Sequence, residues 1–111
     1  WSFSICSLKG RVKMDQLQEF RAQIDKIDSC LVDLFEMRMN LAKRIAAYKL
    51  ENDLPILNEK REAEVIEKNL SKLKNKDYEG ELVEFFKTLM QLSKQVQLRE
   101  FNKYDIKIEE V

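Results

Sequence analysis

Polar and charged side chains interrupt three otherwise apolar helical stripes in this chain of 111 residues. Arg38 falls on the first stripe and Glu62 on the second, while Ser93 and Gln97 lie one turn apart on the third. A single charge on such a stripe can reach solvent or pair with a carboxylate of another helix. Three coincident breaks instead indicate a polar pocket between helices, a common place for sites in helical bundles.

Two further cations share the helix that Arg38 occupies. Lys49 follows Arg38 by eleven residues, so an α-helix returns it to nearly the same face, about 16 Å along the axis. Two long cationic side chains can converge on a small anion across that gap. Arg21 precedes Arg38 by about 25 Å of helix and can reach such an anion only in the pocket of an antiparallel partner. Solvated surface charge is the alternative for Arg21 and Lys49.

The composition restricts the chemistry to a few side-chain types. The chain has no histidine, which removes the commonest general base and the commonest metal ligand. Cys6 and Cys30 show neither metal-ligand spacing nor a disulfide framework, and they favour a reduced, cytoplasmic setting. A formal net charge of zero argues against general nucleic-acid binding, and no apolar run reaches the length of a membrane span. Arg, Lys, Glu, Ser and Gln remain as candidates.

The elements that must position these groups are helices. The chain has 2 Gly, 1 Pro and 36% charged residues, a composition that favours helix. Residues 15–53 contain neither Gly nor Pro, and Pro55 ends the stretch. Their apolar residues recur every three or four positions, as on the packed face of a helix. This first apolar stripe consists of Leu17, Phe20, Ile24, Ile27, Leu31, Leu34, Leu41, Ile45 and Tyr48.

The first helix is too long for the globule that one chain can form. About 38 helical residues span roughly 57 Å, whereas a compact domain of this size has a radius of gyration of about 13 Å. Because the apolar stripe runs along the whole helix, the overhanging part needs a partner, and a symmetric dimer is the simplest one.

Two shorter helices complete the expected all-α fold of three helices per chain. The second is predicted from its N-cap residue Asn58 to Lys74, a polar turn follows at 75–80, and the third is predicted from Glu81 to Phe101.

The predicted helical domain covers residues 14–101. Residues 1–13 show no helical period, and we interpret them as an extension that is non-native or disordered, with an ordered N-terminal arm as the alternative. No structure is assigned to the C-terminal tail, residues 102–111.

The ordered set of polar residues resembles the small all-helical chorismate mutases, such as the mutase domain of bifunctional chorismate mutase/prephenate dehydratase proteins. The resemblance covers about residues 14–101. It includes R-x-x-I-D-x-I-D at 21–28, E-x-R-x-x-L-A at 36–42 and the proline before the second helix. The positions that carry it are Arg21, Arg38, Lys49, Asn58-x-x-Arg61-Glu62 and Ser93-x-x-x-Gln97.

The resemblance implies an intertwined homodimer with shared active sites that rearranges chorismate to prephenate, a step towards phenylalanine and tyrosine. This reaction is pericyclic and unimolecular, so it needs no cofactor, metal or nucleophile, which fits a chain without histidine. The protein has to hold a flexible dianion in its reactive shape and stabilise the charge that develops on the ether oxygen.

The implied catalytic residues are Arg38, Lys49 and Gln97, and Arg21 is implied to bind substrate beside Arg38. Arg38, together with Arg21 of the partner subunit, binds the substrate carboxylates, for which a bidentate guanidinium is suited. Lys49 and Gln97 donate to the ether oxygen.

The remaining roles implied by the resemblance concern substrate binding. Ser93 adds a hydrogen bond to a carboxylate, and Glu62 accepts from the ring hydroxyl. Arg61 lies at the pocket edge and strengthens the positive field. Asn58 matches a position that is often Asp; it contacts the substrate or serves only as a helix cap.

Two other functions stay open on the sequence. Isochorismate pyruvate lyase uses the same scaffold and a similar cationic pocket, and the loop at 51–60 does not decide between the two activities. A non-catalytic helical dimerisation or regulatory module fits the charged helices, but leaves Arg38, Glu62, Ser93 and Gln97 without a role.

Overall fold

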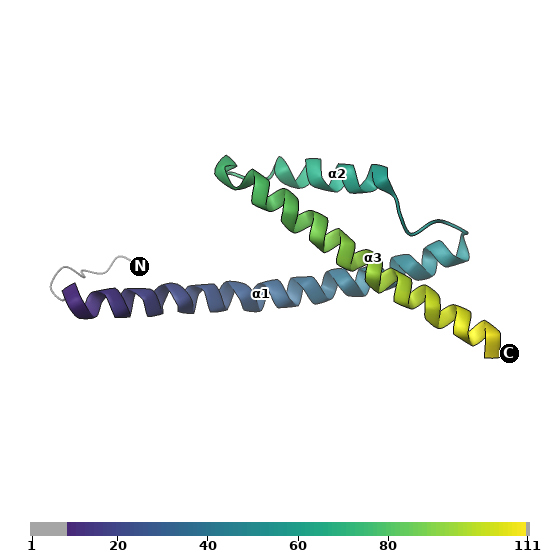
Figure 1. The fold of residues 1–111 in the computed structure, drawn as a ribbon, viewed down its shortest axis with the longest axis horizontal. Coiled ribbons are helices and arrows are strands. Elements are labelled where there is room, and N and C mark those ends of the chain that lie inside the picture. Colours follow the sequence, from purple (N-terminus) through teal and green to yellow (C-terminus); the bar gives the residue numbers. More distant parts are fainter. Residues whose placement is uncertain (1–8, 111) are drawn as a thin grey trace. The chain divides into compact units, whose positions relative to one another are not determined.

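The computed structural model describes the backbone of residues 9–110 and the side chains of residues 15–103. Every regular element in this range is helical: α1 (Lys9–Glu51), α2 (Glu59–Leu70), the short 3₁₀ helix η1 (Lys76–Tyr78) and α3 (Glu79–Glu110) (Figure 1). The predicted all-α class and the very long first helix are confirmed. No described helix is both long and apolar enough to cross a membrane.

The helix bounds differ from the predicted ones mainly at the ends. α1 begins at Lys9, inside the segment 1–13 that we set apart, while residues 1–8 lie outside the described residues. α3 continues to Glu110, through most of the tail that had no assignment.

The second helix was predicted to reach Lys74, and it ends at Leu70. The final carbonyls of α2 find other partners: the Ser71 hydroxyl donates to Lys68 O at 2.6 Å and Lys76 Nζ donates to Leu70 O at 3.0 Å. Because these carbonyls are satisfied, the helix can stop one turn early.

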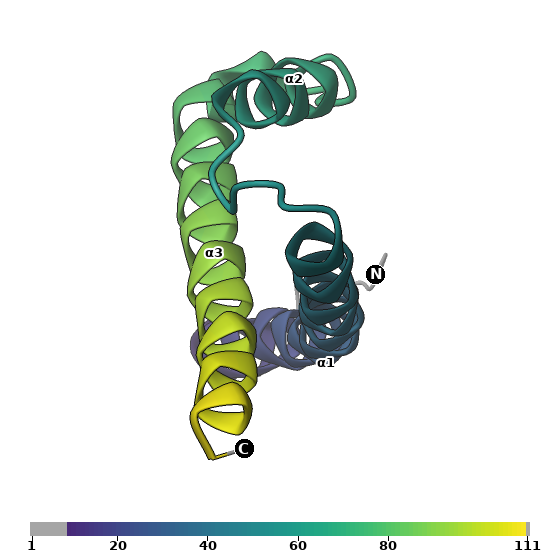
Figure 2. The same cartoon turned by 90° about the vertical axis from the view of Figure 1, so that its right-hand side faces the viewer.

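Asn58 is the N-cap of α2, as predicted. Its backbone is extended (φ −137°), and its side-chain oxygen accepts a hydrogen bond from the Arg61 backbone N–H at 3.0 Å. α2 contacts α3 next to the turn that contains η1 and joins the two helices (Figure 2). The Asn58 cap fixes where α2 starts and therefore places the residues of its first turn.

The C-terminus of α1 is closed by a residue in the left-handed conformation. Asp53 has a φ of 54°. The Leu54 N–H reaches back to Lys49 O at 2.8 Å and the Asp53 N–H to Leu50 O at 3.5 Å. This is the Schellman arrangement, in which glycine is the usual residue and Asp is tolerated at some cost. The motif directs residues 54–58 away from the helix axis.

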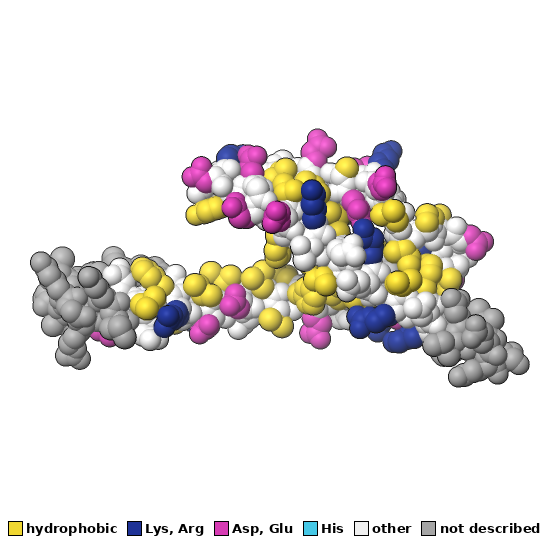
Figure 3. Space-filling model, in the orientation of Figure 1, with side chains coloured by type: hydrophobic (Ala, Val, Ile, Leu, Met, Phe, Trp, Pro, Cys, Tyr) yellow, Lys and Arg dark blue, Asp and Glu magenta, His cyan; other side chains and the backbone are white. Residues whose placement is uncertain are grey.

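The chain divides into two compact units, residues 1–37 and 38–111. In the first unit, none of the described side chains from 15 to 37 is buried. The large apolar residues of this part of α1 are 41–64% exposed, and apolar side chains line its surface in Figure 3. Six of them form what we call the 17–34 face: Leu17, Phe20, Ile24, Ile27, Leu31 and Leu34.

The second unit has a small core of its own. Its buried apolar residues come from all three helices: Met39, Ala42, Ala46, Val65 and Met90. On α1 the core therefore uses two alanines and a methionine, whereas Leu41, Ile45 and Tyr48 of the predicted stripe are exposed.

Candidate active site

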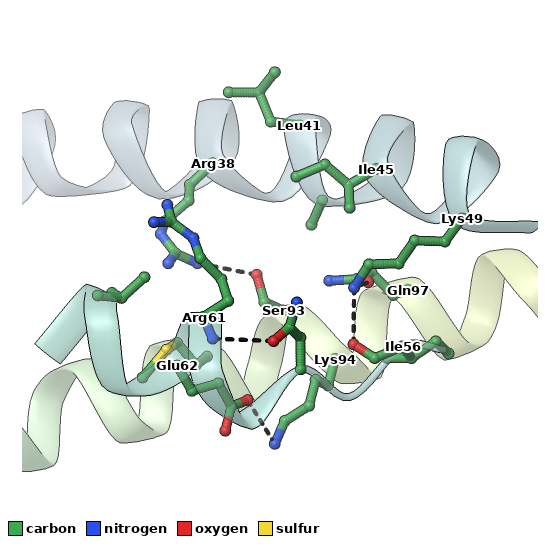
Figure 4. A pocket seen from close by; sticks show the side chains of 14 residues that line it. Arg38, Leu41, Ile45, Lys49, Ile56, Arg61, Glu62, Ser93, Lys94 and Gln97 are labelled. Carbon is green, nitrogen blue, oxygen red and sulfur yellow. Dashed lines mark hydrogen bonds and ion pairs between the residues drawn. The ribbon is translucent and has the colours of Figure 1, made fainter. Parts of the chain in front are cut away.

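A pocket of about 440 Å³ lies within the second unit, between residues of α1, α2, α3 and the loop that follows α1 (Figure 4). It has the size of a small-molecule site. Seven of the eight predicted site residues line it: Arg38, Lys49, Asn58, Arg61, Glu62, Ser93 and Gln97. The eighth, Arg21, belongs to the first unit, where its side chain is exposed.

One end of the pocket carries two guanidinium groups. Arg38 Nη1 donates to the hydroxyl of Ser93 at 2.9 Å, and Arg61 lies at the same end (Figure 4). Burial, and then the charge of Arg61, lower the pKa of Arg38, but a guanidinium stays protonated in proteins. Ser93 is only 8% exposed, so it holds Arg38 in a partly dehydrated position that suits a carboxylate.

The other end is organised around Lys49. Its ammonium donates to the Ile56 carbonyl at 2.8 Å and to Gln97 Oε1 at 3.1 Å. Because an ammonium has three protons and no acceptor, one N–H remains for a ligand. The Gln97 oxygen accepts from Lys49, and the Gln97 amide nitrogen is available as a donor. This end therefore offers two donors from these two side chains.

The charge state of Lys49 depends on its surroundings. Burial lowers the pKa of the Lys49 ammonium, and the negative charge of Glu62 acts in the opposite direction. Gln97 is only 7% exposed and stays neutral, so it adds hydrogen-bonding capacity without a compensating charge.

Glu62 forms an ion pair with Lys94 on the α2–α3 side of the pocket. Lys94 Nζ lies 2.9 Å from Glu62 Oε2, and both side chains are largely buried. Asn58 and Arg61 stand at the margin: the Asn58 oxygen is used as the α2 cap, and the Arg61 side chain is exposed, with a distant partner in Glu64 at 3.9 Å. Such an exposed pair contributes little energy.

Two pocket groups were missed by sequence reasoning. Lys94 follows Met90 by four residues, so it fits the third stripe as well as Ser93 does, and this was the available signal. The Ile56 carbonyl left no signal, because a main-chain acceptor is independent of the side chain at its position.

No group of three or more His, Cys, Asp or Glu side chains within the described range is arranged to hold a metal.

Comparison with known proteins identifies one family. The model of chorismate mutase type II matches residues 20–98. A bifunctional chorismate mutase/prephenate dehydratase of Aquifex aeolicus (strain VF5) is 44% identical over 57 residues, which is 51% of this chain and 16% of that protein. The chain thus corresponds to a small part of this relative. No solved structure matches it significantly.

Proposed function

The chain belongs to the chorismate mutase type II family, and we propose on that basis that it is an isomerase that rearranges chorismate to prephenate. The observation that carries the proposal is the pocket itself. Arg38 stands at one end of the pocket and the Lys49–Gln97 pair, with its two donors, stands at the other. A site of this kind suits a small dianion whose reaction needs positioning and charge stabilisation.

Positioning is the first contribution of the pocket residues. The rearrangement breaks the ether C–O bond of the substrate while a C–C bond forms in the same cyclic transition state, so no atom enters or leaves. Arg38 holds a carboxylate, and Ser93, which accepts from Arg38 at 2.9 Å, fixes the guanidinium and adds a donor. Holding the side chain over the ring removes the entropy cost of reaching the reactive shape.

Electrostatic stabilisation is the second contribution. Negative charge grows on the ether oxygen as its bond to the ring stretches. The free N–H of Lys49 and the amide nitrogen of Gln97 are the donors available for that oxygen, and Lys49 is already held by Ile56 O and Gln97 Oε1. Preorganised donors of this type each contribute about 10²–10³-fold in rate.

Glu62, Asn58 and Arg61 complete the proposed substrate site. The Glu62 carboxylate accepts from the ring hydroxyl, and Arg61 adds to the positive field at the end that Arg38 occupies. The Asn58 oxygen is engaged as a helix cap, so any contact of this side chain with substrate uses its amide nitrogen.

We further propose that the chain acts as a homodimer in which Arg21 of the partner subunit completes each site. The 17–34 face supports this, because contiguous exposed apolar surface on a helix marks an interaction site. A second copy of the same helix covers such a face in a self-complementary way.

Mixing of two inactive variants tests this assembly. Arg21→Ala and Arg38→Ala should each abolish most activity. After joint refolding, half of the dimers are mixed, and each of these has one intact site, so about a quarter of wild-type activity should return. No recovery in the mixture, with mixed dimers verified by mass spectrometry, contradicts a shared site.

The reaction itself is tested by the loss of chorismate absorbance with formation of prephenate, in parallel with an assay on isochorismate. Turnover of chorismate that disappears in Arg38→Ala supports the proposal. Release of pyruvate from isochorismate without chorismate turnover assigns the lyase activity instead. Inactivity on both substrates leaves a non-catalytic helical module, which gives no reason for a pocket lined by Arg38, Glu62, Ser93 and Gln97.

We also propose that the reaction is a step towards phenylalanine and tyrosine. We propose a cytoplasmic location for the protein, because its two cysteines favour a reduced setting.

A further inference from the structure

The Lys94–Glu62 ion pair differs from the other ion pairs among the described side chains. Its two atoms are 2.9 Å apart and it joins α3 to α2, whereas the other two pairs are 3.9 Å long and link residues three apart on one helix. The Lys94 and Glu62 side chains are 28% and 29% exposed, and both line the pocket. Partial burial makes such a pair stronger and its loss more costly than at the surface.

The Glu62 carboxylate interacts electrostatically with two lysines of the pocket. Lys94 forms an ion pair with it. Lys49 instead donates hydrogen bonds to Ile56 O and Gln97 Oε1, and Glu62 acts on it without direct contact. Figure 4 shows the Glu62 carboxylate turned toward Lys94, on the side of the pocket away from α1. The charged groups that line the pocket with Lys49 are Arg38 on its own helix, Arg61 and Glu62 on α2, and Lys94 on α3.

We propose that Lys94 is a positioning residue: it holds the Glu62 carboxylate on the α2–α3 side of the pocket and so leaves Lys49 free to donate to the substrate. The inference rests on the proposed function for its effect on rate, but its electrostatic part does not. Without Lys94, Glu62 is an unpaired, largely buried carboxylate, and Lys49, on which Glu62 already acts electrostatically, is a cation that can neutralise it. Lys49 paired with Glu62 would leave Gln97 without its partner and the ether oxygen without its cation.

The substitution Lys94→Met removes the charge and keeps the aliphatic stem. We expect kcat/KM to fall about tenfold, a barrier change of about 1.4 kcal/mol. The pKa of Lys49 should rise, since it gains Glu62 as a direct partner, and the alkaline limb of the kcat/KM profile should move to higher pH. Lys94→Arg should restore both. Lys87→Met, at an exposed position seven residues earlier on α3, is the matched control and should change neither.

A second carboxylate variant separates positioning from a simple charge effect. If Lys94 acts through Glu62, then Glu62→Gln should lower the pKa of Lys49 more strongly in the Lys94→Met background than in the wild-type chain. Equal effects in the two backgrounds mean that the carboxylate does not move, and they overturn the inference.

The pKa of Lys49 is followed directly by NMR of the ¹³Cε–Hε signals of labelled lysines, assigned with Lys49→Arg. This readout needs no turnover. A wild-type chain that does not rearrange chorismate overturns the proposed function, while the titration still decides the role of Lys94. Normal chorismate turnover in Lys94→Met, with an unchanged pKa of Lys49, overturns only the present inference.

Discussion

The two parts of α1 use the same apolar period for different purposes. Residues 15–37 carry a regular apolar face and bury none of it. Residues 38–51 bury Met39, Ala42 and Ala46 and place Arg38 and Lys49 in the pocket. A three- and four-residue repeat therefore predicts that a helix has a packing face, but the partner that covers it can come from the same chain or from another.

The two parts of α1 also differ in the size of their apolar residues. The first part exposes large side chains such as Phe20 and Ile24, which contribute much area to an interface. In the second part the core positions are occupied by one methionine and two alanines, and the large Leu41 and Ile45 line the pocket while remaining exposed. We expect the first part to determine assembly and the second to determine chemistry.

The largest effect is expected at Lys49. Lys49→Ala should lower kcat/KM by about 10³-fold, because in the proposed mechanism it removes a held donor and the positive charge next to the ether oxygen. The melting temperature should change little. Lys43→Ala, an exposed position on the same helix, is the control. Normal turnover in Lys49→Ala would remove this residue from the mechanism.

Gln97→Glu should make activity depend on acid. A carboxylic acid at this position donates only when protonated, and Lys49 Nζ, which lies 3.1 Å from the Gln97 oxygen, would hold the introduced carboxyl group ionised at neutral pH. We expect a loss of about 10²-fold near neutrality that is partly recovered at low pH. A flat pH–rate profile for the variant contradicts a donor role for Gln97.

A charge on the 17–34 face should act on assembly first. Ile24→Asp should weaken the proposed dimer by about 3 kcal/mol, since two-fold symmetry would introduce the substitution twice. Analytical ultracentrifugation should show dissociation, and activity should depend on protein concentration. Ala22→Asp, exposed on the opposite side of the same turn, should leave the dimer intact. Equal effects of both substitutions would show that the face is not an interface.

The pH dependence of the wild-type enzyme should separate the chemistry of the second part from its stability. Burial lowers the pKa of Lys49 below its ordinary 10.5, so kcat/KM should fall on the alkaline side before a free lysine would lose its proton. The stability changes in the opposite direction: the free energy of unfolding rises with pH while kcat/KM falls. The cost of burying the ammonium is present below the lowered pKa and disappears as the pH rises from that pKa to 10.5. Measurements of kcat/KM and of the free energy of unfolding in denaturant, both as a function of pH over this window, check the two expectations.

The smallest effect is expected at the end of α1. Asp53→Ala should destabilise the chain by about 1 kcal/mol, because alanine tolerates a φ of 54° less well than Asp. Asp53→Gly should be neutral or slightly stabilising. Urea unfolding measures both variants, and a change larger in Gly than in Ala would contradict the role assigned to the backbone.

Local signals predicted most of the fold and of the site. The α1 period, the Asn58 cap and the polar breaks at Arg38, Ser93 and Gln97 are each determined within a few residues of sequence, and the structure agrees with them.

The features that sequence analysis missed depend on tertiary structure. The choice of Lys94 as the partner of Glu62 depends on how α2 and α3 pack, which no local pattern contains. The burial of Ala42 and Ala46 was overlooked because larger apolar residues beside them fit the same period. The early end of α2 depends on Lys76, six residues beyond the last helical carbonyl that it caps.

The carbonyl of Ile56 has a consequence for how this site tolerates change. Lys49 is anchored there by the main chain, at 2.8 Å. Substitution of the Ile56 side chain therefore leaves the acceptor in place, whereas the insertion or removal of a single residue between Asp53 and Asn58 moves it. The side chain at position 56 can vary, but the length of the loop is constrained by the position of one lysine.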